Sequence, residues 1–203
     1  MALTHAVKNL GHKGVMIQTN FRGRDLDHPV FEPFYDQLET LDVPLFLHPH
    51  DVAGHERCQD YYLTNLIGNP LDTTIAVSRM LLGGVFERHP ELKVCLVHGG
   101  GQFPFIKGRL DHGYRERPEA QKLAPRSPSA YLGQIWFDTI THWDPALMFL
   151  IDHFGEDHVY LGSDYPFDMA DKDGVERIRR LVPSKKAQGK ILGGNAANLL
   201  KLQ

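Results

Sequence analysis

Five short apolar stretches, separated by segments whose apolar residues recur at helical spacing, constrain the fold of this chain more than any other feature. They are Gly14–Thr19, Val43–Leu47, Lys93–Val97, Gln134–Thr139 and Val159–Ser163. Strands that alternate with helices form βαβ units, in which the strands run parallel and the crossovers are right-handed. The sequence therefore predicts an α/β fold whose strands all end at one edge of a parallel sheet.

Three of these stretches lead into a side chain that can ligate a metal or transfer a proton. His48 follows the second stretch, His98 the third and Asp164 the fifth. Because parallel strands end at the same edge, we expect these side chains to be neighbours although they are far apart in sequence. Each also has a structural interpretation by itself: a strand cap for His48, an N-cap for Asp164 and a bond to a backbone carbonyl for His98.

The residues around His98 favour the functional interpretation of that strand end. Three glycines follow the histidine directly, so the backbone can turn sharply and a ligand can approach closely. Two imidazoles and a carboxylate at one edge suit Zn²⁺ or a similar divalent ion. Such an ion lowers the pKa of bound water to about 7. The strand ends therefore predict a metal centre.

The spacing of apolar residues also predicts the helices that cover the sheet. His28–Leu41 places Val30 on an apolar helical face, and Asp72–Arg88 is expected to form one long helix through a central glycine pair. Phe103–Tyr114 is expected to form the helix after the three glycines. Arg115–Pro128, with three prolines and many charges, is expected to be a surface loop.

Charge and composition exclude several classes of protein. The formal net charge of -3 and a pI of about 6.4 provide no basic field for nucleic acid or an anionic membrane. No apolar run approaches the ~20 residues needed to span a bilayer, and the N-terminus lacks the apolar core of a signal peptide. Two cysteines are too few for a disulfide framework and favour the cytoplasm. The chain length favours one domain over residues 1–203.

Longer motifs in this sequence closely resemble the metal-dependent decarboxylases of the amidohydrolase superfamily, the group that contains aminocarboxymuconate-semialdehyde decarboxylase. The similar segments are LFLHPHD at Leu45–Asp51, the run Gly83–Val94, HGGG with a following GR within Cys95–Pro118, VYLGSDYPF at Val159–Phe167 and GNAANLL at Gly194–Leu200. The motifs are jointly specific in this order. The resemblance implies a TIM-like (β/α)₈ barrel with one divalent metal ion, which we expect to be Zn²⁺.

The resemblance also implies roles for individual residues. His48 and Asp164 match positions that ligate the metal, and Asp164 also aligns the reacting groups. His98 matches the catalytic histidine of the HGGG motif.

Three further residues match positions associated with the substrate. Arg109 and Arg117 correspond to arginines that bind substrate carboxylates, a task for which the bidentate guanidinium is suited. A solvated surface charge is an equally good interpretation of Arg117. Tyr62 falls near an aromatic position that lines the pocket of the family.

The sequence departs from the family at its N-terminal end. The first barrel strand of the family carries an H-x-H or E-x-H pair of metal ligands, and nothing like it precedes Gly14. A complete barrel takes ~250 residues, so we expect an incomplete barrel with about the last five parallel strands. Its open edges favour a homo-oligomer. His48 and His50 form an H-x-H pair of their own that could supply two ligands, although Pro49 argues against this.

These observations favour a metal-dependent, non-oxidative decarboxylase that acts on a small unsaturated or aromatic carboxylic acid. One alternative is a metal-dependent hydrolase of an ester or lactone, because fold and metal do not fix the reaction. Another is a non-catalytic fragment or subunit that lacks the ligands of the first strand.

Overall fold

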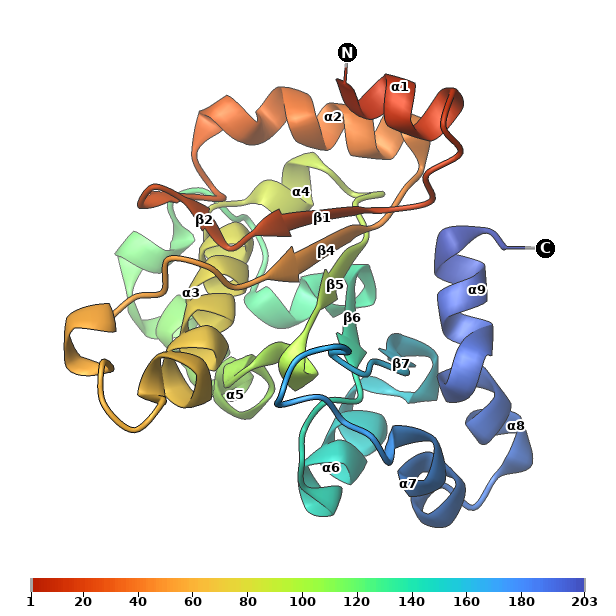
Figure 1. Cartoon of the computed structure of the whole chain (residues 1–203). Coiled ribbons are helices and arrows are strands. Elements are labelled where there is room, and N and C mark those ends of the chain that lie inside the picture. Colours follow the sequence, from red (N-terminus) through yellow and green to blue (C-terminus); the bar gives the residue numbers. More distant parts are fainter. Residues whose placement is uncertain (1, 203) are drawn as a thin grey trace.

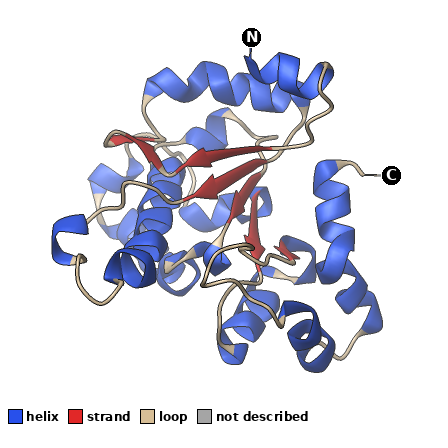
Figure 2. Cartoon of the chain, viewed as in Figure 1, coloured by secondary structure: helices blue, strands red, loops and turns tan. Residues whose placement is uncertain are grey.

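The computed structural model describes residues 2–202 and is built on a parallel sheet of five strands (Figures 1 and 2). In spatial order the strands are β1 (Val15–Gln18), β4 (Leu45–His48), β5 (Val94–Leu96), β6 (Ile135–Asp138) and β7 (Val159–Tyr160). Every neighbouring pair in this sheet is parallel. The predicted α/β class is therefore confirmed, and within the described residues β1 and β7 are the two edges of the sheet.

Nine α-helices connect and cover the strands in the part of the chain that the structure describes. They are α1 (Ala2–Lys8), α2 (Glu32–Leu41), α3 (Asn69–Leu82), α4 (Val85–Arg88), α5 (Phe103–Glu116), α6 (Asp144–Phe154), α7 (Gly174–Leu181), α8 (Lys185–Gly189) and α9 (Asn195–Leu200). A small antiparallel ribbon, β2 (Asn20–Phe21) with β3 (Arg24–Asp25), follows β1.

The alternation of side chains along the strands gives the sheet two different faces. Leu45 and Leu47 of β4 belong to the main buried core, together with residues of α2, α3, α5 and α6. Phe46, between them, points to the other face, where it packs with Cys95, Tyr160 and Leu199 of α9. Figure 1 shows α9 beside β7 and away from α2 and α3. His48, two residues after Phe46, points to this second face as well, close to the end of the neighbouring strand β5.

The predicted single helix over Asp72–Arg88 is wrong in its middle. Helix α3 ends at Leu82, and Gly84 adopts a left-handed conformation with φ 72° before α4 begins. A side chain at Gly84 would place its Cβ 2.5 Å from the carbonyl oxygen of Leu123. The close approach of this loop, which the local sequence does not show, is the reason for the break.

Two smaller expectations are also corrected. The segment predicted as a helix over His28–Leu41 starts with a short 3₁₀ turn, and α2 proper begins at Glu32. Val30, expected on the apolar face, is 53% exposed, whereas Tyr35 is fully buried and donates a hydrogen bond from its hydroxyl to the carbonyl of Leu26. No helix among residues 2–202 is long and apolar enough to cross a bilayer.

A buried histidine ties α2 to the end of α4. His89 is buried, and its ring nitrogens lie 2.9 Å from Glu32 Oε2 and 3.1 Å from Glu39 Oε2. Arg88 adds an ion pair to Glu32 with 2.7 Å between Nη2 and Oε1. The Arg88 hydrogen bond, aided by His89, holds the pKa of Glu32 below its usual range, although partial burial opposes this.

This network predicts a pH-dependent contribution to stability. Glu32→Gln is expected to lower the free energy of unfolding by ~1–3 kcal/mol at pH 7, because it removes the carboxylate that faces both the buried His89 and the partly exposed Arg88. A carboxylate whose pKa is lowered on folding stabilises above its unfolded pKa, and this stabilisation is lost as the pH falls through the folded pKa. Urea unfolding of the variant and the wild type, at pH 7 and again below pH 4, measures the loss of unfolding free energy at each pH. Glu56→Gln, at an exposed site, is the control, and an equal loss at both pH values would contradict the prediction.

Candidate active site

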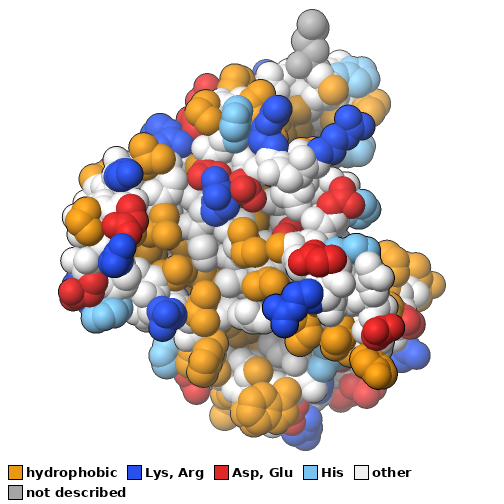
Figure 3. Space-filling model, turned by 90° about the vertical axis from the view of Figure 1, so that its left-hand side faces the viewer, with side chains coloured by type: hydrophobic (Ala, Val, Ile, Leu, Met, Phe, Trp, Pro, Cys, Tyr) orange, Lys and Arg blue, Asp and Glu red, His pale blue; other side chains and the backbone are white. Residues whose placement is uncertain are grey.

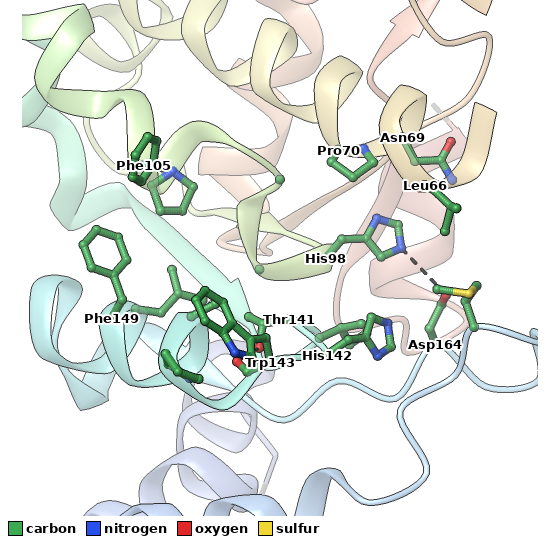
Figure 4. Close-up of a pocket in the computed structure, with 18 of the residues that line it drawn as sticks. Leu66, Asn69, Pro70, His98, Phe105, Thr141, His142, Trp143, Phe149 and Asp164 are labelled. Carbon is green, nitrogen blue, oxygen red and sulfur yellow. Dashed lines mark hydrogen bonds and ion pairs between the residues drawn. The ribbon is translucent and has the colours of Figure 1, made fainter. Parts of the chain in front are cut away.

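The ends of β4, β5 and β7 bring together the three side chains that the sequence singled out. His48, His98 and Asp164 each offer one ligand atom, and these atoms all lie within 4.8 Å of one another. The distance from His98 Nε2 to Asp164 Oδ2 is 3.7 Å, and the two imidazole rings meet edge to face with centroids 5.4 Å apart. Figure 4 shows the His98 ring directed at Asp164. The expectation that these residues are neighbours is confirmed.

The environment of His98 favours the neutral imidazole. Burial is the largest influence and lowers its pKa, the carboxylate of Asp164 raises it, and the nearby His48 lowers it again. Within the described residues, the Nδ1 atom of His98 is buried without a hydrogen-bond partner. A neutral imidazole keeps one lone pair free, so His98 can bind a cation or accept a proton.

The donor set fits a divalent metal ion. Two imidazoles and one carboxylate, converging from three strand ends, supply the nitrogen and oxygen ligands that such ions take in proteins. His50, the other half of the HxH pair, is not part of this cluster: its ring is 62% exposed and its Nδ1 lies 3.2 Å from Asp51. The structure thus gives no support to His50 as a ligand.

Several residues at these strand ends adopt a backbone conformation that is rare for side chains other than glycine. His98 and Asp164 both have φ 55°, and His142 has φ 52°. Non-glycine residues in this region carry strain and cluster at functional sites. Three of the nine non-glycine residues with positive φ in the described part of the chain therefore lie at this site, and the other six lie elsewhere.

A pocket with a cavity volume of about 620 Å³ opens beside His98 and Asp164. One wall is apolar and includes Phe105, Trp143 and Phe149 (Figure 4). Besides His98 and Asp164, the polar part of the lining comprises the side-chain amides of Asn65 and Asn69, the hydroxyl of Thr141 and the ring of His142. Figure 3 views the molecule from the side toward which β1 and β4 point, and hydrophobic side chains gather on the lower half of that face. The pocket can accommodate a flat apolar molecule with one end beside His98 and Asp164.

The three residues predicted to bind substrate lie outside this pocket lining. Arg109 is exposed on α5, and Arg117 is exposed and forms an ion pair with Glu119. The hydroxyl of Tyr62 donates a hydrogen bond to Asp168 Oδ1 at 3.2 Å. Within one chain, then, the structure brings together the residues predicted to hold the metal, and the residues predicted to bind substrate are not among those that line the pocket.

Two residues at the end of β6 were not singled out from the sequence. His142 lines the pocket, and Asp138 is fully buried behind His98. Burial raises the pKa of Asp138 to about 7, opposed by hydrogen bonds from the backbone of Gly99, Ile140 and His98. A signal for Asp138 was present, because the stretch QIWFDT carries a carboxylate at its next-to-last position, just as the fifth stretch leads into Asp164.

The sequence matches a family of known proteins over nearly its whole length. The family described as Amidohydrolase covers residues 2–202. The chain is 39% identical to the 2-amino-3-carboxymuconate-6-semialdehyde decarboxylase of Dictyostelium discoideum over 98% of its own length and 56% of that protein. It is 28% identical to a gamma-resorcylate decarboxylase of Rhizobium sp. over 83% of its own length and 56% of that protein. The chain therefore spans little more than half the length of these curated relatives.

Solved structures with the same fold include decarboxylases with a bound metal. The 5-carboxyvanillate decarboxylase of Sphingomonas paucimobilis superimposes with a TM-score of 0.91 at 26% identity, covering 100% of this chain and 62% of that one. A dihydroxybenzoic acid decarboxylase of Polaromonas sp. JS666, solved with manganese and the inhibitor 2-nitroresorcinol, gives a TM-score of 0.87 at 25% identity, covering 99% and 64% of the two chains. The five-stranded sheet described here is therefore part of a larger fold in those enzymes.

Proposed function

The chain belongs to the amidohydrolase family, and from this premise we propose that it carries the catalytic centre of a metal-dependent, non-oxidative decarboxylase acting on a small unsaturated or aromatic carboxylic acid. The observation that carries the proposal is the convergence of His48, His98 and Asp164 within 4.8 Å at the strand ends, beside a pocket with an aromatic wall. Relatives and structural neighbours named as decarboxylases of such acids support it.

In this proposal His48 and Asp164 hold the metal, for which we propose zinc, while manganese is the ion named in solved relatives. A bound divalent ion supplies a positive charge that polarises a carboxylate and acidifies water. Trp143 and Phe149 provide apolar surface for the carbon skeleton of the substrate. Arg109, Arg117 and Tyr62 stay predictions as substrate contacts.

The proton balance of the reaction assigns the task of His98. When the bond between the substrate carbon and its carboxylate breaks, CO₂ leaves and the electron pair stays on the carbon, which must take up one proton. No oxidant or reductant is required. His98 lines the pocket and its Nε2 lies 3.7 Å from Asp164 Oδ2, so it is placed to hold or pass on that proton.

The proposal predicts metal-dependent release of CO₂ that requires Asp164. The purified chain, loaded with Zn²⁺ or Mn²⁺, is incubated with 2,6-dihydroxybenzoate, 5-carboxyvanillate and 2-amino-3-carboxymuconate-6-semialdehyde, and CO₂ and metal content are measured. Asp164→Asn should lose at least about 100-fold in metal affinity, since ligating groups matter no less than the partners that orient them. Asp152→Asn, at an exposed acid of α6, should behave as wild type. Turnover without CO₂ would indicate a hydrolase, and a chain that neither binds metal nor turns over would contradict the proposal.

Two further properties belong to the proposal. We place the protein in the cytoplasm, supported by its two free thiols, Cys58 and Cys95. We also propose that it forms a homo-oligomer, supported by the two sheet edges and the exposed Trp143 and Phe105, which are 65% and 86% exposed.

A further inference from the structure

We propose that Asp138 is a positioning residue, whose buried carboxyl group fixes the turn that carries His98 and aligns it with the loops that follow β6 and β7. The inference deepens the proposed function, because it concerns the same site, and it rests on contacts that none of the comparisons assigns. Asp138 touches none of the pocket space itself; it acts through the residues that it holds.

The first contact is with the turn after β5. Oδ2 of Asp138 accepts the backbone N–H of His98 at 2.9 Å, and Oδ1 accepts that of Gly99 at 2.7 Å. Both residues are in the left-handed region, with φ 55° for His98 and φ 60° for Gly99. A histidine adopts this conformation only when its surroundings stabilise it. Consecutive N–H groups presented by a turn form a concave site for an anion, and the Asp138 carboxylate occupies that site.

The second contact is with the loop after β6 itself. Oδ1 of Asp138 also accepts the backbone N–H of Ile140 at 3.0 Å. Ile140 is followed by Thr141 and His142, and all three line the pocket. One oxygen atom thus joins the turn of His98 to the wall that carries His142, which Figure 4 shows on the same side of the pocket as Asp164.

The third contact is with the segment after β7. A Cβ added at Gly162 would lie 2.8 Å from the Cβ of Asp138, so the two backbones approach closely here. The N–H of Gly162 donates to Thr139 Oγ1 at 3.2 Å, which fixes the approach. Asp164 is two residues further along the chain. Asp138 therefore lies where the three segments that carry His98, His142 and Asp164 meet, and it is only 2% exposed.

The decisive variant is Asp138→Asn, which keeps the shape of the side chain and replaces one acceptor oxygen by a donor. An NH₂ group then faces a backbone N–H that it cannot bind, so the turn must shift. We expect the amide proton signals of His98 and Gly99 and the ring signals of His98 to move in NMR spectra of ¹⁵N-labelled protein. We also expect kcat to fall roughly 10- to 100-fold, as for residues that orient catalytic groups, with KM changed much less. Asp152→Asn is the matched control and should leave both unchanged.

A second variant perturbs the same contact without altering any hydrogen-bonding group. Gly162→Ala pushes a methyl group against the Cβ of Asp138, and Gly162 does not require a left-handed conformation. It should reproduce the shift of the His98 ring signals and the loss of kcat. If Asp138→Asn fails to fold, Gly162→Ala still tests whether Asp138 positions His98.

The NMR readout separates this inference from the proposed function. If wild type releases no CO₂ but the His98 signals move in both variants, Asp138 positions His98 and the proposed reaction is wrong. If the folded variants leave the His98 signals and kcat unchanged, or lose activity only in proportion to the unfolded fraction, the role of Asp138 is structural and the inference is overturned.

Discussion

Replacing His98 by Asn is expected to lower turnover by roughly 10²- to 10⁴-fold, the range that general acid–base catalysis contributes. The reason is geometric: His98 is the imidazole that lines the pocket and also faces Asp164, with 3.7 Å between Nε2 and Oδ2. Asn keeps a polar side chain of smaller size but cannot carry a proton at neutral pH. The measurement is kcat for CO₂ release, with metal content determined on the same samples.

The metal content distinguishes two ways in which His98 could matter. If the variant keeps its metal and loses turnover, His98 transfers or orients the proton. If it loses both, His98 belongs to the ligand set together with His48 and Asp164, a geometry that the distances also allow. His112→Asn, on the exposed surface of α5, is the control. Wild-type turnover in the His98 variant would show that the proposed chemistry is wrong.

Gly101→Ala is expected to destabilise the protein by roughly 3 kcal/mol or more, the sum of a strained backbone and an overfilled contact. Gly101 has φ 64°, which disfavours any side chain. A Cβ at this position would be far inside the van der Waals contact distance from the Pro70 carbonyl oxygen and 3.0 Å from both the Pro70 carbonyl carbon and Thr74 Oγ1. Backbone atoms at the start of α3 cannot yield as a flexible side chain would.

Gly108→Ala, in the helix α5 that follows this turn, is expected to have the opposite effect on stability. Gly108 lies inside α5 and a Cβ there meets nothing within 4 Å. Alanine should therefore stabilise by about 0.5–1 kcal/mol, because glycine loses more backbone entropy in a helix. Urea unfolding of both variants against wild type measures the contrast. A Gly101→Ala protein within 1 kcal/mol of wild type would mean that the turn after His98 is more adaptable than its contacts indicate.

The parts of the fold that follow from chain direction could be predicted from the sequence. Once the apolar stretches are assigned as parallel strands, His48, His98 and Asp164 must meet at one edge, and they do. The direction in which a side chain on a helix points relative to that edge could not be predicted in the same way. Arg109 matches a family motif, yet it lies on an exposed part of α5, and the motif contains no information on where the helix directs it.

The features that the sequence did not predict, namely the helix break at Gly84 and the places of Asp138 and His142 at the site, have a common physical cause. The expected helix breaks at Gly84 because Leu123, 39 positions further along the chain, approaches this residue. Asp138 contributes to the site because it accepts backbone N–H groups from the turn that begins at His98, 40 positions earlier. Both effects are tertiary contacts between segments with no local signature. His142 belongs to the same class, because only the path of the loop after β6 directs it into the pocket.

The free side of β1 has a consequence for how any assay is run. Within residues 2–202, β1 is hydrogen-bonded on one side, to β4, and its other side presents a row of backbone donors and acceptors able to recruit a further strand. If copies of the chain associate through this edge, the turnover per chain depends on the protein concentration. A dilution series, read before any kinetic constant is assigned, tells whether the working unit is one polypeptide or several.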